Sequence, residues 1–269
     1  MDILGAKKIC ILGKQNQTTK IDIDGVVYYA KQDDDFLEVI CSRLANICGI
    51  PCFQYEPVVI DEAIAQKLGK DFFPKNRLPD NTINYVFSKD ISYCGDFISA
   101  RKKFPELNRL CSLYDIWNSI EKNYPDNTKK LMTEIVRMYI FDYFIMNDDR
   151  ETLNYGILNS DTVVVFDHQA SFTVWTQTIT TEDAGFYDSK FVDIGIFLKT
   201  SSQEFVDLFE NMLIMIPPKI LNVTIKQIEH EYNIKIEKKL SFQAKYRINY
   251  NKIINVFNNL KYGSEKKIK

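Results

Sequence analysis

The stretch FIMNDDRETLNYGIL, residues Phe144–Leu158, decides the fold. It opens on the end of a strongly apolar run, and three acidic residues, an arginine and two asparagines then follow within eight positions, 147–154. The run is apolar nearly all round, which predicts a buried helix that ends near Met146. The polar side chains therefore emerge directly from a core. Charged groups are rarely placed there unless they are paired or functional.

A predicted strand that ends on a polar residue follows this loop. The β-branched run TVVVFD, residues 162–167, predicts a strand that ends at Asp167. If the two segments leave one core side by side, Asn154 and Asp167 come together, and their oxygens are ligands suited to Mg²⁺. Asp149, five residues before Asn154, could accept a proton from an incoming hydroxyl, which is the set that phosphoryl transfer needs. As a structural alternative, Asp149 and Arg150 could simply cap neighbouring backbone.

A cation for phosphate is available earlier in the chain. Lys31 ends the predicted strand VVYYAKQ, and Glu38 follows seven residues later on the next predicted helix. A lysine on a strand that pairs with a glutamate on the next helix is held extended toward phosphate. The simpler alternative for each residue is a solvated side chain.

The first 90 residues are rich in strand signals. Residues 8–12 predict a strand, TKIDIDGVVYYAK predicts a hairpin that turns at Asp24-Gly25, and residues 53–60 and 81–88 predict two more strands. Between them, residues 35–50 carry apolar side chains at helical spacing and stop at Gly49.

Beyond residue 90 the pattern is helical, with TVVVFD as the single predicted strand. We expect helices over residues 113–124, 129–146, 202–216 and 239–260. The sequence thus predicts an α+β, two-lobe fold: a small β-rich lobe over residues 1–90 with one main helix, and a larger helical lobe over residues 91–269.

Composition narrows the function classes. A net charge of −2 gives no basic field for DNA or RNA, so we expect no direct nucleic-acid binding. Six scattered cysteines without a CxxC pair, together with two histidines, argue against a zinc site and suit buried thiols in a reducing cytosol. No apolar run reaches about 18 residues and no signal peptide is evident, so we expect neither a membrane span nor a leader.

These motifs, in this order, resemble the HipA-type serine/threonine kinases, which have a protein-kinase-like fold. The family's catalytic loop, N-x-D-x-H-x-x-N, is similar to Asn147–Asn154, and its strand-end aspartate is similar to the one in Phe166-Asp167-His168. Its phosphate loop, G-x-Q-x-K-T, resembles Gly13–Thr18, and its helix motif resembles Glu38–Gly49. The resemblance covers about residues 8–200.

The resemblance implies a role for each matching residue. Asp149 would be the catalytic base, Asn154 and Asp167 would hold magnesium, and Lys31 would contact the α- and β-phosphates with Glu38 as its partner. The phosphate-loop residues implied to cradle ATP are Gly13, Lys14, Gln15, Asn16, Gln17 and Thr18. The main chain of Val86, Phe87 and Ser88, up to Lys89, would hold the adenine. The Phe87 ring would either wall that pocket or pack inside the lobe.

Four features depart from the family pattern. The loop histidine is Glu151 here, the phosphate-loop lysine is Gln17, and no glycine follows Asp167. Lys14 or Lys20 would have to replace the missing cation. The extra N-terminal subdomain of the longest members does not fit in this chain, which therefore resembles the compact members.

The resemblance implies an ATP- and Mg²⁺-dependent protein serine/threonine kinase that also phosphorylates itself. It allows a role as the toxin of a toxin–antitoxin pair, with a small antitoxin or regulatory partner. Its substrate would be a protein hydroxyl, presented by a segment over residues 168–190. The conceivable autophosphorylation sites are Thr18, Thr19, Thr178, Thr180 and Thr181. We expect it in the bacterial cytoplasm, with secretion as an effector left open. A small-molecule kinase on the same fold and a non-catalytic binding module are the alternatives.

Overall fold

The structure is a computed structural model, and it describes residues 6–12, 18–61, 63–64, 82–107, 112–147, 149–172 and 203–262. Residues 13–17 of the predicted phosphate loop, Asp148 and most of the predicted substrate-presenting segment lie outside these ranges.

The first part of the chain forms a five-stranded antiparallel sheet with the order β1-β2-β3-β5-β4. Its strands are β1 (Lys7–Leu12), β2 (Thr18–Ile23), β3 (Val26–Gln32), β4 (Tyr55–Ile60) and β5 (Ile83–Lys89). Lys31 on β3, the central strand, is paired with Val86 on β5. The predicted strands of this lobe are confirmed.

The turn between β2 and β3 has the two-residue form that the sequence predicts. Asp24 and Gly25 have φ values of 53° and 82°, and Ile23 pairs directly with Val26. Both central residues of this hairpin turn need positive φ, which an Asp-Gly pair adopts readily. The turn fixes the register of β3 and therefore the position of Lys31.

Helix α1 (Leu37–Ile47) follows β3 after a short connection. The Asp33 carboxylate accepts the Glu38 backbone N–H at 2.7 Å, which satisfies one of the free donors in the helix's first turn. The chain leaves the helix through Gly49, whose φ is +65°. The connection of residues 33–36 is short and tied to the first turn of α1, which sets Lys31 and Glu38 side by side.

The second part of the chain is mainly helical, with one small sheet. After η2 (Ile91–Cys94) come β6 (Phe97–Ser99) and α3 (Ala100–Lys103), and β7 (Tyr155–Leu158) and β8 (Thr162–Val165) complete a three-stranded sheet of order β6-β7-β8. The larger helices and one further short turn are α4 (Leu113–Asn123), η3 (Pro125–Asn127), α5 (Thr128–Ile145), α7 (Gln203–Met215), α8 (Pro218–Tyr232) and α9 (Lys239–Tyr262).

The expectation of a single strand beyond residue 90 is wrong. TVVVFD does form β8, but β6 and β7 pair with it in the same sheet. Both are only three or four residues long, too short for a clear alternating pattern. Helix α8 is not among the predicted helices. It begins at Pro218, and a proline fits in the first turn because its missing N–H costs nothing there.

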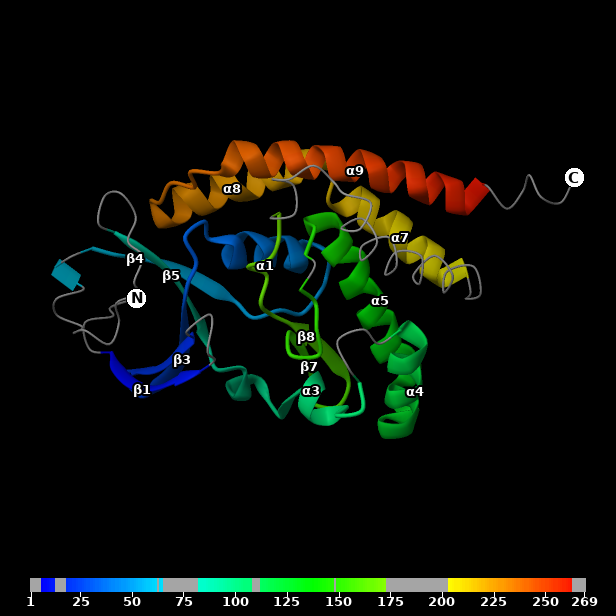
Figure 1. Cartoon of the computed structure of the whole chain (residues 1–269), viewed down its shortest axis with the longest axis horizontal. Coiled ribbons are helices and arrows are strands. Elements are labelled where there is room, and N and C mark those ends of the chain that lie inside the picture. The colour runs from blue at the N-terminus through cyan, green and yellow to red at the C-terminus, as the bar shows by residue number, and fades with distance from the viewer. Residues whose placement is uncertain are drawn as a thin grey trace, which may run out of the picture.

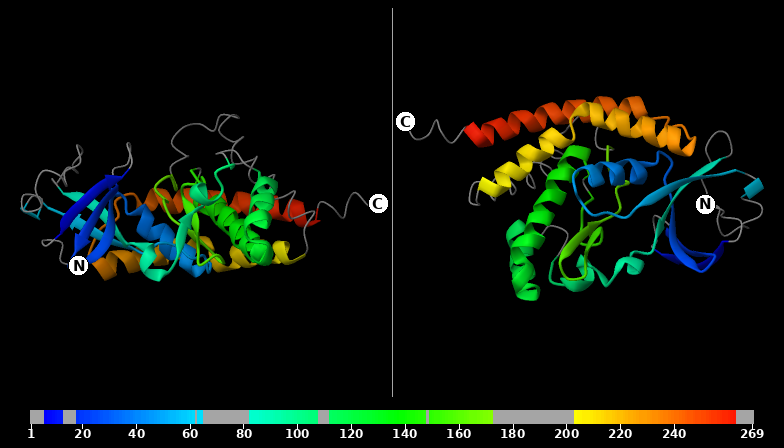
Figure 2. Two further views of the ribbon diagram at one scale, coloured as in Figure 1. Left: turned by 90° about the horizontal axis from the view of Figure 1, so that it is seen from below. Right: turned by 180° about the vertical axis from the view of Figure 1, so that it is seen from behind.

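The described residues form two hydrophobic cores. The smaller one lies on one face of the five-stranded sheet and includes Ala30 and Phe87. The larger core contains α1, α5 and the inner faces of α8 and α9, so α1 shares a core with the helices of the second part. Figures 1 and 2 show α8 and α9 running together along one edge of the molecule, next to α1. The lobe boundary near residue 90 stays a prediction.

No single helix among the described residues is long and apolar enough to cross a bilayer, although the bent pair Val206–Met215 and Pro218–Tyr232 meets that test by length and composition.

Candidate active site

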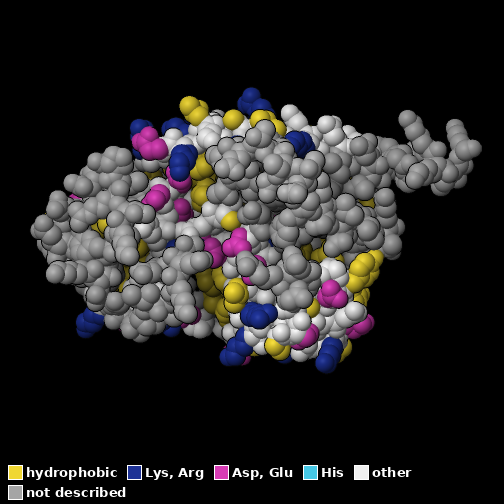
Figure 3. Space-filling model, in the orientation of Figure 1, with side chains coloured by type: hydrophobic (Ala, Val, Ile, Leu, Met, Phe, Trp, Pro, Cys, Tyr) yellow, Lys and Arg dark blue, Asp and Glu magenta, His cyan; other side chains and the backbone are white. Residues whose placement is uncertain are grey.

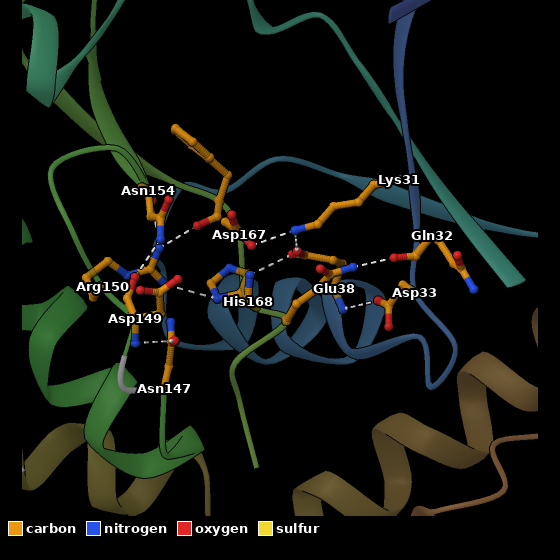
Figure 4. A network of polar contacts seen from close by, with 12 residues as sticks. Lys31, Gln32, Asp33, Glu38, Asn147, Asp149, Arg150, Asn154, Asp167 and His168 are labelled. Carbon is orange, nitrogen blue, oxygen red and sulfur yellow. Dashed lines mark hydrogen bonds and ion pairs between the residues drawn. The ribbon is translucent and has the colours of Figure 1, made fainter. Parts of the chain in front are cut away.

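The buried ammonium group of Lys31 is the centre of the site. Its Nζ donates to Glu38 Oε1 at 2.9 Å and to Asp167 Oδ1 at 2.5 Å (Figure 4). Burial acts to lower the pKa of Lys31, but the two carboxylates outweigh it, so that the pKa lies above its ordinary value. Lys31 is thus a fixed positive charge, and the predicted pairing with Glu38 is present.

Glu38 connects this pair to the second part of the chain. It is fully buried, and its other oxygen accepts the backbone N–H of His168 at 2.8 Å. Burial raises the pKa of Glu38, while the neighbouring Lys31 acts in the opposite direction. With an ammonium and an N–H both donating to it, the carboxylate holds Lys31 and the segment after β8 in one arrangement.

The register of β7 and β8 explains how Asn154 and Asp167 meet. Tyr155 pairs with Val165, so the residues just outside this pair, Asn154 and Phe166, also lie opposite each other, and Phe166 N donates to Asn154 O at 3.1 Å. Asp167 comes next and has a φ of 60°, which turns the chain sharply. Figure 4 shows the Asn154 and Asp167 side chains as neighbours at the end of this hairpin.

The predicted catalytic loop is folded around Asn154. The Asn154 amide nitrogen donates to the Asp149 backbone oxygen at 2.5 Å, and the Asn154 N–H donates to Glu151 O at 2.9 Å. Because the amide nitrogen is used in this way, the amide oxygen is the atom left to face a cation. Asp149 lies on the same loop, next to Asn154 (Figure 4).

Arg150 is the internal brace of the site, a role that the sequence did not reveal. The side chain is fully buried and makes two hydrogen bonds to Asp142 on α5, at 2.8 and 2.9 Å. It also donates to the backbone oxygens of Asn154 at 2.6 Å and Phe166 at 2.5 Å. One guanidinium thus fixes both segments that carry the predicted metal ligands. Its bond to Asn154 O, four residues away, is the backbone capping that the sequence allowed for Arg150, whereas the bonds to Asp142 and Phe166 were not expected.

Asp142 and His168 complete this brace. His168 Nδ1 lies 3.0 Å from the Arg150 guanidinium and accepts its N–H, since burial and the adjacent cations hold the pKa of the ring well below its usual value. A signal for Asp142 was available: a carboxylate within the otherwise apolar stretch of residues 138–146 requires a cationic partner. Arg150, eight residues further on, was the nearest candidate beyond the helix.

Three phenylalanines form an aromatic cluster beside Asp167. The rings of Phe53 and Phe166 stack with centroids 4.7 Å apart, and Phe97 lies within 5.9 and 6.1 Å of them. All three are only partly buried. Such a cluster offers apolar faces on which a flat ring can stack.

The residues predicted to bind adenine share one strand, but their side chains lie on different faces of the sheet. Val86, Phe87 and Ser88 lie inside β5, paired with β3 on one side and β4 on the other. The Phe87 ring packs in the small core with Ala30, on the face opposite Lys31 and Val86, so the expectation that it walls the pocket is wrong and packing inside the lobe is correct.

Lys14 and Lys20 were the candidates for the cation that is missing at Gln17, and of these two the structure describes Lys20. Lys20 lies on the same face of the sheet as Tyr29 and Lys31, and its ammonium pairs with Asp90 at 3.2 Å and lies over the Tyr29 ring. Lys14 belongs to residues 13–17, outside the described part of the chain, as do Gly13, Gln15, Asn16 and Gln17. Thr18 begins β2, and Thr19 is buried in that strand, which argues against Thr19 as a modification site.

The donor set suits magnesium. In the described part of the chain no group of three or more His, Cys, Asp or Glu side chains has metal-site geometry. One carboxylate and one amide oxygen are instead what Mg²⁺ uses when phosphates and water supply its remaining ligands. Asp167 keeps 36% of its side-chain surface exposed, so it can meet such a ligand from the open side.

No protein-family model and no curated protein matches the sequence. Among solved structures, the Helicobacter pylori proinflammatory kinase CtkA is similar with a TM-score of 0.64 and 14% identity, over 96% of this chain and 97% of that one. HipA of Shewanella oneidensis, solved with HipB and operator DNA, is similar with a TM-score of 0.54 and 12% identity, over 93% of this chain and 63% of that one. This likeness, together with the site geometry, shows that the chain has a HipA-like kinase fold.

Proposed function

We propose that the protein is an ATP- and Mg²⁺-dependent protein serine/threonine kinase. The observation that supports this most is the convergence of Lys31, Glu38 and Asp167, which come from β3, α1 and the end of β8. The Lys31 ammonium lies 2.9 Å from the Glu38 carboxylate and 2.5 Å from that of Asp167. An ammonium held between two carboxylates, beside a loop that carries Asp149 and Asn154, matches the parts that phosphoryl transfer requires.

Each residue has a task in this proposal. Lys31 binds the α- and β-phosphates, and Glu38 keeps it extended. Asn154 and Asp167 would hold Mg²⁺, which supplies charge neutralisation on the phosphates. Asp149 orients the acceptor hydroxyl and takes its proton. Arg150 binds no substrate but keeps the two ligand-bearing segments in register.

The nucleotide base would lie near the aromatic cluster of Phe53, Phe97 and Phe166. Phe166 directly precedes Asp167, so a nucleotide held there by its phosphates has these rings within reach. Much of the main chain of Val86–Ser88 is already paired within the sheet. The backbone that can bind adenine in this proposal is therefore that beyond Lys89, the last residue of β5.

A partner protein is part of the proposal. The similar HipA was solved with HipB, and by analogy this chain would work with a small antitoxin or regulatory partner. The antitoxin and the autophosphorylation of Thr178, Thr180 or Thr181 stand on this analogy and on the resemblance in motif.

The decisive experiment is incubation with γ-labelled ATP and Mg²⁺, followed by mass spectrometry of the protein and of added protein substrates. We expect label on serine or threonine. Asp149→Asn should lower the transfer rate by at least about a hundredfold, the scale of a lost general base, with MgATP affinity nearly unchanged. Label on small metabolites alone would favour a small-molecule kinase, and MgATP binding without any transfer would favour a binding module.

A further inference from the structure

Leucine 153 stands out on the catalytic loop because its side chain is exposed. It lies between the buried Thr152 and Asn154, yet it remains 57% exposed. The loop's internal hydrogen bonds turn Asn154 inward, which leaves the neighbouring Leu153 side chain directed to solvent. An apolar side chain one residue from a predicted metal ligand, and four from the predicted base, lies where an acceptor chain has to pass.

A short basic helix is attached to the same loop. The backbone N–H of Arg101, in α3, donates to Thr152 O at 2.8 Å, so α3 lies against the residue that precedes Leu153. Three of the four residues of α3 are basic: Arg101, Lys102 and Lys103. On the face seen in Figure 3, Lys and Arg side chains lie over α3, below the acidic side chains at the centre of that face.

The three cations are not equally available. Arg101 donates to the backbone oxygen of Leu107 at 2.9 Å, and Lys103 lies 4.7 Å from the centroid of the Tyr124 ring. Lys102 is exposed, and within the described residues it forms no ion pair. Its position, opposite the buried Ala100 on the helix, directs it away from the core.

Charge changes sign across this edge of the site. Asp149 and Glu151 are acidic on the loop, whereas α3 is wholly basic beyond Ala100. A peptide that lies across Leu153 therefore has its acidic groups repelled on the side of the loop and attracted on the side of α3. Such a pattern fixes the direction of a bound segment and selects its charge.

We propose that Leu153 and α3 form a substrate-selecting surface for a protein segment that carries an apolar residue and one or more acidic residues near the acceptor serine or threonine. This inference rests on the proposed kinase activity and names its substrate class. Leu153 would contact the apolar residue, and Lys102, with Arg101 beside it, would bind the acidic ones.

The test is a positional-scanning library of serine and threonine peptides, phosphorylated with MgATP by the full chain. Wild type should prefer Asp or Glu over Lys at one position by about fivefold, the ratio that corresponds to an exposed charge pair of about 1 kcal/mol. Lys102→Glu should abolish or reverse this ratio, and Leu153→Ser should remove the preference for an apolar neighbour. Lys226→Glu, an equal charge change on the exposed side of α8, is the matched control and should keep both preferences.

Binding separates this inference from the proposed function. Two labelled peptides of equal length, Ser-Leu flanked by Asp or by Lys, are followed by fluorescence anisotropy at low and high salt. Tighter binding of the acidic peptide that weakens with salt and with Lys102→Glu supports the surface even if no phosphate is transferred. The inference is overturned if neither assay shows a charge preference, or if the basic peptide is preferred. Phosphate transfer observed in the same experiments would still support the proposed kinase activity.

Discussion

At the scale of single residues, Arg150 is the one on which the site geometry depends. It is fully buried and binds Asp142, two backbone oxygens and His168. Arg150→Lys keeps the charge but loses the planar fork, so the Asp142 carboxylate and the backbone oxygens cannot all be satisfied. We expect a loss of about 2–4 kcal/mol in the free energy of unfolding, measured by urea denaturation.

The control for this change is Arg43→Lys. Arg43 also binds a carboxylate, that of Glu231 at 2.8 Å, but both side chains are 40–47% exposed. Its loss should cost less than about 1 kcal/mol, as for other surface pairs. If the two variants unfold at the same urea concentration, Arg150 is not a structural brace.

Asp33 gives a prediction about pH. It is buried, and desolvation with the nearby Glu38 raises its pKa from 3.8 to about 7. The folded state then holds this proton more tightly than the unfolded state, so this group makes stability fall as pH rises from about 4 to about 7. Asp33→Asn retains an acceptor for the Glu38 N–H and cannot ionise.

The measurement is urea unfolding of both proteins at several pH values between 4 and 8. Relative to wild type, Asp33→Asn should gain stability as pH increases through this window, and the difference should become constant above about pH 7. A constant difference across the whole range would show that Asp33 ionises normally in the folded protein.

At the scale of elements, Gly156 on β7 is a place where a side chain does not fit. A Cβ there would lie 2.5 Å from the Phe97 ring and 2.6 Å from the backbone oxygen of Ile98. The strand pairing that aligns Phe97 with Leu158 holds both groups in place. Gly156→Ala should therefore lower the free energy of unfolding by about 1–3 kcal/mol, as overpacking does.

Combining Gly156→Ala with Phe97→Ala provides the control. Removing the ring relieves one clash and leaves the other, that with the carbonyl of Ile98, so we expect partial rescue of the loss caused by Gly156→Ala, measured against Phe97→Ala alone. Because Phe97 borders Phe166, both single variants should also weaken MgATP binding by calorimetry. Additive losses with no rescue would show that the ring is not what Gly156 accommodates.

Elements with strong local patterns were predictable from the sequence, and those fixed by pairing were not. The Asp24-Gly25 hairpin and the helix that ends before Gly49 follow from turn chemistry and periodicity. Strands β6 and β7 depend on one another and on β8, and carry too few residues to show alternation. The same holds in the site: Lys31, Glu38, Asn154 and Asp167 could be predicted together, whereas the buried contacts of Arg150 needed the fold.

At the scale of the whole molecule, the two parts of the chain are joined at the site itself. Lys31 binds Asp167, the Glu38 carboxylate accepts from His168, and Gln169 donates to the backbone oxygen of Gln32. Three links thus connect β3 and α1 to the segment after β8, and they involve three consecutive residues of that segment, 167–169. A ligand that binds both Lys31 and Asp167 acts on this junction and should stabilise the folded chain as a unit.

This arrangement predicts how MgATP affects thermal stability. A ligand at a hundred times its dissociation constant stabilises the folded state by about 2.7 kcal/mol, which raises Tm by roughly 5–10 °C in a chain of this size. Wild type should show that increase with MgATP and a much smaller one with ATP and EDTA. In Asp167→Asn the amide keeps the side chain's shape but loses its charge for the cation, so the increase with MgATP should fall to the EDTA level.

Asp161→Asn is the matched control for this experiment, because Asp161 lies at the turn of the same β7–β8 hairpin and pairs with Lys130, away from Lys31. It should respond to MgATP as wild type does. Both variants lose one carboxylate from the β7–β8 hairpin. They differ in its position, because Asp161 lies at the turn and Asp167 follows the end of β8. An equal MgATP response in all three proteins would mean that Asp167 holds no cation, and that Lys31 and Asp167 form a structural ion pair.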